Sequence, residues 1–131
     1  SGVRLKYADE SQAQVTVPYK WFSRNPFRST YFACLSMAAE MSTGVIGLMA
    51  IQGQAKTVSM LVTNLEATYS KKASERIYFT CENGNEIFNA VEKTLTDGEG
   101  VTVKCISTGK TKDGTIVSTF AVVWSFKAKN K

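Results

Sequence analysis

Hydrophobic and polar residues alternate with a period of two over much of the chain, and this pattern predicts β-strands. The alternating stretches lie at residues 3–8, 12–19, 57–70, 75–81, 101–108 and 115–127. Asp9-Glu10-Ser11 predicts a turn between the first two strands, and Asp113-Gly114 predicts a hairpin between the last two. The first pair therefore reads as an N-terminal hairpin.

Two of the predicted strands are apolar on both faces. In the strand at 57–70 we expect Val58, Met60 and Val62 on one side and Leu61, Leu65 and Tyr69 on the other. In the last strand we expect Ile116, Phe120, Val122, Trp124 and Phe126 on one face and Val117, Ala121 and Val123 on the other. For the last strand, apolar residues on both faces predict a central strand covered on both sides.

Two stretches have helical periodicity instead. Residues 85–96 predict a short amphipathic helix, and Ser29 or Thr30 would cap a longer one that runs from about 29 to as far as 51. The longer helix is apolar on one face (Phe32, Leu35, Ala39, Ile46), and its opposite side is small and nearly uncharged (Ala33, Ser36, Met37, Glu40, Thr43, Gly44). A helix without a charged face is expected to be buried on all sides.

Glu40 is the only charged residue between Ser29 and Ala55. We expect it to be buried with its helix, and a buried carboxylate must be paired, protonated or functional. One interpretation makes it a general base or nucleophile. The other makes it a structural group, paired with Arg28 or Lys56 or hydrogen-bonded across a dimer interface. Polar residues interrupt the helix too often for a membrane span, which needs about 20 apolar residues.

The predicted order is β-β-α-β-β-α-β-β, an α+β fold in which an antiparallel sheet surrounds a long helix. The chain has 131 residues, 44% hydrophobic and 21% charged, and we expect residues 1–131 to form a single domain. It contains no histidine, which excludes Ser-His and Cys-His nucleophile pairs, histidine bases and histidine metal ligands. Any catalysis must therefore use carboxylates, hydroxyls, lysines or backbone amides, and no metal site is expected.

The three cysteines, Cys34, Cys81 and Cys105, are odd in number and form no Cys-x-x-Cys motif. We expect them to be reduced, buried and apolar in role. No basic segment followed by an apolar one precedes a cleavage site, so we expect a cytoplasmic protein. The net charge of +5 would suit anionic ligands, but the lysines are scattered rather than interleaved with exposed aromatics, which argues against nucleic-acid binding.

The segment Arg24-Asn25-Pro26-Phe27-Arg28-Ser29-Thr30-Tyr31-Phe32-Ala33-Cys34-Leu35-Ser36-Met37-Ala38-Ala39-Glu40, set between a hairpin and long strands, resembles the hotdog-fold thioesterases, in particular the phenylacetate-pathway (PaaI-like) enzymes. In that family an Asn precedes His-Gly-Gly at the helix start, and an acidic residue follows about nine positions after the His. Here Asn25 and Glu40 match the Asn and the acidic residue, while Tyr31-Phe32-Ala33 replaces His-Gly-Gly. The chain looks closest to a divergent, uncharacterised branch that lacks the signature.

The resemblance implies an acyl-CoA or acyl-carrier-protein thioesterase, with Glu40 as general base or nucleophile and Asn25 orienting water or the thioester oxygen. Backbone N–H groups near Tyr31, Phe32 and Ala33 would polarise the carbonyl. Ordinary capping by Ser29 or Thr30, and a turn role for Asn25 before Pro26, are the alternatives.

Lys71 and Lys72 lie where the long strands should turn near a dimer edge, and they would meet the phosphates of coenzyme A unless they are ordinary turn lysines. Trp21 and Trp124 are expected in the core or an interface. The resemblance implies a homodimer with the site between subunits, and tetramers are common in the family. No cofactor is expected beyond the coenzyme A of the substrate.

The leading hypothesis is therefore a thioester hydrolase. The alternative is a non-catalytic hotdog module that binds acyl chains or acyl thioesters, which the replacement of His-Gly-Gly favours. Hotdog dehydratases and hydratases depend on a histidine, and this chain has none.

Overall fold

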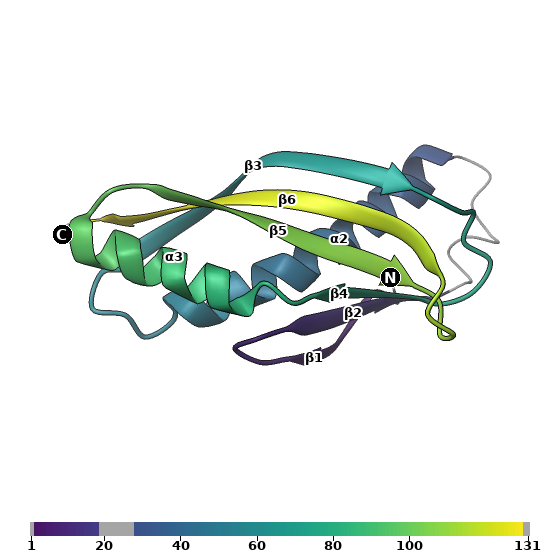
Figure 1. Cartoon of the computed structure of the whole chain (residues 1–131), viewed down its shortest axis with the longest axis horizontal. Helices are drawn as coiled ribbons and strands as arrows, with labels where there is room; N and C mark the ends of the chain where they lie inside the picture. Colours follow the sequence, from purple (N-terminus) through teal and green to yellow (C-terminus); the bar gives the residue numbers. More distant parts are fainter. Residues whose placement is uncertain (1, 19–27, 130–131) are drawn as a thin grey trace.

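The computed structural model describes residues 2–18 and 28–129, and its elements follow the predicted order. They are β1 (Arg4–Ala8), β2 (Ala13–Val17), α2 (Arg28–Ile51), β3 (Thr57–Tyr69), β4 (Ile77–Cys81), α3 (Gly84–Asp97), β5 (Val101–Lys110) and β6 (Ile116–Lys129) (Figure 1).

The strands form one six-stranded antiparallel sheet in the order β1-β2-β4-β5-β6-β3. Strands β1 and β3 are its two edges, and they lie at opposite borders of the molecule in Figure 1. Helix α2 contacts all six strands, because the sheet curves around it, while α3 covers one end of the sheet beside β5 and β6. This is the helix-in-sheet arrangement that the resemblance predicted.

A β-bulge in β3 changes which of its residues face α2. The register with β6 shifts between Val62 and Asn64, so Val62 pairs with Trp124 but Leu65 pairs with Val122. Paired residues share a face of the sheet, and the extra residue of a bulge moves the following side chains to the opposite face. Leu65 and Tyr69 therefore share the inner face with Met60 and Val62, whereas Leu61 faces outward. The sequence pattern predicted Leu61, Leu65 and Tyr69 on the face opposite Val62. This prediction is correct for Leu61 and wrong for Leu65 and Tyr69.

Strand β6 lies between β5 and β3, so its central position is confirmed. Its inner face is buried at Phe120, Val122 and Phe126, as expected. The expectation of cover on both sides is only partly met, because Ala121 and Val123 on the outer face are half-buried. Ile116, which was expected on the inner face, is 45% exposed and lies outside the core. The register between β5 and β6 is irregular between Gly109 and Lys110, and Ile116 pairs with Lys110 beyond this irregularity.

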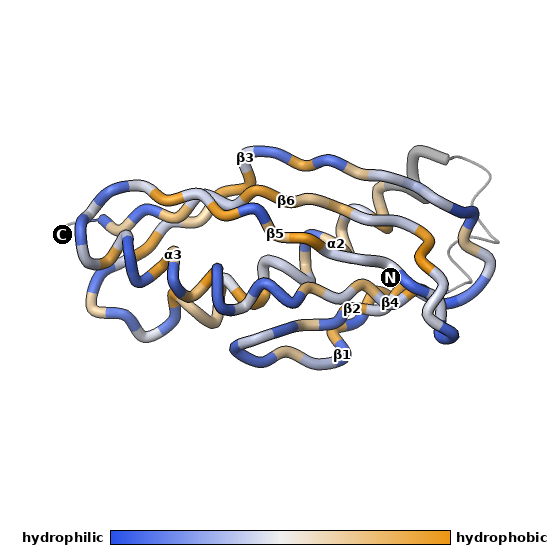
Figure 2. Tube along the Cα trace, in the orientation of Figure 1, coloured by the Kyte–Doolittle hydropathy of each residue, from blue (hydrophilic) through white to orange (hydrophobic). Residues whose placement is uncertain are grey.

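The core consists of two clusters on the inner side of the sheet. One contains Leu35 and Ala39 of α2 with Phe79 and Phe120, and the other contains Ile46 with Ile87 of α3 and Phe126. Leu35, Ala39 and Ile46 are fully buried, which confirms the predicted inward face of α2; the side chain of Phe32 is outside the described part. The apolar residues of the tube in Figure 2 follow α2 and the strand segments around it.

One helical stretch among the described residues, Ala33–Ile51, has the length and composition of a membrane span. Within the chain 56% of that stretch is buried, as in the core helix of a globular protein. Its apolar character is accounted for by the sheet that surrounds it.

Candidate functional site

A groove of about 580 Å³ lies along α2, in the gap that the curved sheet leaves between its two edges. One wall is formed by Leu5 of β1, and the other by Met60 of β3 and Trp124 of β6. The helix supplies the rest of the lining: Met37, Glu40, Met41, Gly44, Val45 and Leu48. From Met37 to Leu48 the helix rises about 16 Å, which is the length of the stripe that the sheet leaves open.

Glu40 is exposed in this groove, so the prediction that it is buried was wrong. The charge pattern could not reveal this, because α2 is apolar on nearly all sides and the gap in the sheet happens to fall over Glu40. Glu40 forms no ion pair with Lys56; among the described residues the salt bridge found is Lys93–Asp97 on α3. The structural interpretation through Lys56 is therefore not met, while the side chain of Arg28 is outside the described part.

The rest of the exposed stripe is apolar. Met37 is 45% exposed, Met41 is 39% exposed and Leu48 is 57% exposed. Ala33, one turn before Met37, is also exposed. A contiguous apolar stripe with a single carboxylate is a typical lining for a small-molecule site, in which few polar groups provide orientation.

Trp124 is half-buried and its ring is held by a hydrogen bond. Its indole Nε1 donates to Oγ1 of Thr43 at 2.7 Å, and that hydroxyl in turn donates to the carbonyl oxygen of Glu40 at 2.8 Å. The wall of the groove is thus connected to the helical turn that carries the carboxylate. The expected core position of Trp124 is confirmed, because it packs against both core clusters, but the sequence did not predict that it also lines the groove.

Gly44 allows this close approach of helix and indole. A Cβ at position 44 would lie 3.0 Å from Cζ2 of Trp124 and 3.4 Å from Cη2. The one signal in the sequence that points to this contact is the pair of glycines, Gly44 and Gly47, inside a helix, where glycine is unfavourable without a packing reason. The second is also a contact glycine, since its Cβ would lie 2.8 Å from Cε of Met60.

The start of α2 determines which backbone amides are free. Because the helix begins at Arg28, Tyr31, Phe32 and Ala33 are its fourth to sixth residues. An α-helix leaves unpaired only the N–H groups of its first turn. Backbone amides up to about Tyr31 are therefore the better candidates to stabilise an oxyanion, because those of Phe32 and Ala33 are expected to be paired within the helix. Asn25 and Trp21 lie outside the described residues.

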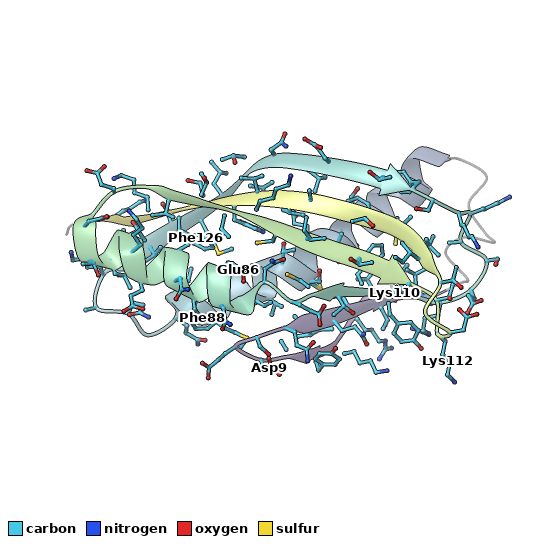
Figure 3. All side chains as sticks on the ribbon, in the orientation of Figure 1. Asp9, Glu86, Phe88, Lys110, Lys112 and Phe126 are labelled. Carbon is cyan, nitrogen blue, oxygen red and sulfur yellow. The ribbon has the colours of Figure 1, made fainter. Side chains whose placement is uncertain are left out.

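Lysines from two distant segments meet at one end of the sheet. Lys71 and Lys72 follow edge strand β3 and are exposed, and the N–H groups of Ser70 and Lys71 donate to the carbonyl oxygen of Val117 at 2.8 and 3.2 Å. This places them beside the start of β6, next to the β5–β6 hairpin with Lys110 and Lys112 (Figure 3). The four lysines form what we call the basic end.

The three cysteines are free and buried, as expected. Burial raises the pKa of Cys34, and a hydrogen bond to Cys81 together with burial raises the pKa of Cys105. None of them lines the groove. Within residues 2–18 and 28–129, no three cysteine or acidic side chains lie together as a metal site would require.

No protein-family model matches the chain, and no curated protein matches it in sequence. Solved structures do match over almost the whole chain. A Pseudomonas aeruginosa protein of unknown function, described as a probable thioesterase, is 16% identical, with a TM-score of 0.82 over 98% of this chain and 85% of that one.

Two further solved structures have the same fold. A thioesterase from Haemophilus influenzae is 8% identical, with a TM-score of 0.61 over 97% of this chain and 79% of that one. A Chlorobaculum tepidum protein of unknown function is 14% identical, with a TM-score of 0.76 over 98% and 83% of the two chains. At these identities the similarity establishes the fold.

Proposed function

The chain has the hotdog fold, and from that premise we propose that it is a thioesterase that hydrolyses acyl thioesters of coenzyme A or of an acyl-carrier protein in the groove along α2. The observation that carries the proposal is the position of Glu40, which is the one carboxylate in an otherwise apolar groove. A fold alone does not specify chemistry, so the site residues must bear the proposal.

In the proposed reaction Glu40 removes a proton from water while the water oxygen bonds to the thioester carbonyl carbon. The tetrahedral intermediate then expels the thiolate as the C–S bond breaks, and the thiolate takes the proton back from Glu40, which restores the carboxylate. As a nucleophile, Glu40 would instead form a mixed anhydride that water hydrolyses. Amides of the first turn of α2 would stabilise the oxyanion, helped by the positive end of the helix dipole. Asn25 keeps its proposed role in orienting the water or the thioester oxygen.

The basic end supports a phosphorylated carrier. Lys71, Lys72, Lys110 and Lys112 lie at the end of the sheet where β3 finishes and β6 begins. Lysines act as point charges for phosphate groups. We propose that they bind the phosphates of coenzyme A, or an acidic carrier protein, while the pantetheine arm follows α2 toward Glu40.

A homodimer would complete the site. Strand β3 is a 13-residue edge strand beside the groove, and an edge of this length is a template for pairing with another chain. We propose that two copies pair along β3 by a two-fold axis, so that each groove faces the partner and Glu40 becomes shielded from water. The proposed enzyme acts in the cytoplasm and uses no cofactor other than its substrate's carrier.

The test is thiol release from a panel of acyl-CoA thioesters, followed with a thiol-detecting reagent. Wild-type protein should release thiol, and Glu40→Gln should lose at least about 100-fold in kcat, as expected for a general base. Glu92→Gln, which changes an exposed carboxylate on α3, is the matched control and should keep full activity.

The second candidate function is a non-catalytic module that binds acyl thioesters. It is favoured by Tyr31-Phe32-Ala33, which stands where the resembling enzymes have His-Gly-Gly. Tight binding of acyl-CoA without thiol release by the wild type would establish this candidate and exclude the thioesterase.

A further inference from the structure

We propose that Trp124 sets the depth of the groove and so determines which acyl chains this protein accepts. The inference rests on the proposed acyl site, but not on hydrolysis. It makes Trp124 a specificity-determining residue and names the ligand class as an uncharged aliphatic acyl group.

The first observation that supports this proposal is the position of the indole. Trp124 packs against both core clusters, so its ring stands between the groove and the interior on the inner face of β6. Removing the ring would open the groove toward the space between α2 and the sheet.

The ring is also held in place, which a specificity wall requires. The 2.7 Å hydrogen bond from Nε1 to Thr43 fixes its edge, and Gly44 lets the helix pack directly on its six-membered ring. A site wall held by packing and a hydrogen bond discriminates between ligands better than a mobile one.

The chemistry of the lining indicates the ligand class. Apart from Glu40 and the indole of Trp124, the lining side chains are aliphatic or thioether, and Met37, Met41 and Met60 contribute three sulfurs. Methionine is flexible and polarisable, so it adapts to ligands of different shape. Away from Glu40, a polar or charged acyl group would find no hydrogen-bond partner among these side chains and would lose its hydration, which is unfavourable.

The experiment measures binding of non-hydrolysable alkyl-CoA thioethers, in a series from butyl to palmityl, by titration calorimetry. Wild-type protein should show a maximum affinity at one chain length. Trp124→Ala should move that maximum to longer chains, with a relative gain of about 10-fold for the longer ligand, the discrimination a hydrophobic pocket achieves for a methylene. Thr43→Val, which frees the ring without removing it, should flatten the length profile.

Phe88→Ala is the matched control, because Phe88 is a half-buried aromatic of α3 that packs in the second cluster and does not line the groove (Figure 3). It should leave the length profile unchanged. If Trp124→Ala does not fold, Trp124→Phe, which keeps a smaller ring, should give a smaller shift in the same direction.

The outcomes separate the two proposals. A shifted profile in the Trp124 variants without thiol release by the wild type would support the groove depth and overturn the thioesterase. An unchanged profile in Trp124→Ala, or the same shift in Phe88→Ala, would overturn the role of Trp124 whether or not thiol is released. Equal affinity for all chain lengths in the wild type would also overturn it.

Discussion

The amide of Gly84 donates a 3.0 Å hydrogen bond to the carbonyl oxygen of Ser11, and this bond joins the first residue of α3 to the β1–β2 turn. The contact is so close that a Cβ at position 84 would overlap the carbonyl oxygen of Glu10 and the backbone of Ser11. The helix therefore begins at a point where only glycine fits.

We predict that Gly84→Ala destabilises the protein by about 3 kcal/mol or more, because the clashing atoms are backbone and have little freedom to move. The free energy of unfolding, measured by urea denaturation, tests this. Gly100→Ala is the control: its Cβ would meet only Cδ of Lys127, at 3.8 Å, and it should stay close to wild type. A loss below about 1 kcal/mol in Gly84→Ala would contradict the packing described here.

The Thr43–Trp124 hydrogen bond gives a second prediction. Thr43→Val keeps the shape of the side chain but leaves the half-buried indole N–H without its acceptor, which should cost about 1–2 kcal/mol. Urea denaturation followed by tryptophan fluorescence reports both the stability and the surroundings of the ring. Thr68→Val, an exposed threonine of β3, is expected to change stability by less than about 0.5 kcal/mol, and an equal loss in both variants would argue against the bond.

The edge strand gives a third prediction. Leu61 is 66% exposed and Leu65 is 41% exposed on β3. Lysines on an edge strand oppose pairing with another chain, so the double variant Leu61→Lys, Leu65→Lys should be monomeric where the wild type is dimeric. Light scattering coupled to size-exclusion chromatography gives the mass directly.

Ile106→Lys is the control for this experiment, since Ile106 is 37% exposed on β5, away from the edge. A wild type that is monomeric at all concentrations, or a double variant that remains dimeric, would exclude the β3 interface.

The cysteines give a fourth prediction. Because the pKa of Cys34 and of Cys105 is raised, little thiolate forms at neutral pH, and the reactive fraction grows only at pH values above the range of an ordinary thiol. The hydrogen bond with Cys105 instead lowers the pKa of Cys81, but Cys81 is fully buried, so reagents do not reach its sulfur in the folded protein. All three should therefore resist thiol reagents in the native protein and react together on unfolding.

Native and denaturant-dependent labelling, analysed by mass spectrometry, would check this. The result also matters for the thiol-release assay, because buried cysteines contribute no background to it. Rapid labelling of any one cysteine in the folded protein would show that its segment opens locally.

Much of the fold was predictable from local patterns. Alternating and helical periodicity, together with the turn sequences, specified the order of the eight elements found among the described residues, because periodicity reflects the geometry of single strands and helices. The faces of β3 were not predictable beyond Val62, since a bulge arises from pairing with β6 and leaves no reliable trace in one strand's sequence.

The sequence by itself determined that Glu40 is the only charged residue between Ser29 and Ala55, within a long apolar helix, because charge spacing is a local property. Only the tertiary structure decided that this charge is exposed, that Trp124 lines the same groove, and that Lys71 and Lys72 lie at the same end of the sheet as Lys110 and Lys112. The reason is that a helix apolar on all sides does not encode which stripe its sheet leaves open. That stripe depends on where the edges β1 and β3 come to lie, and therefore on contacts between residues far apart in the chain.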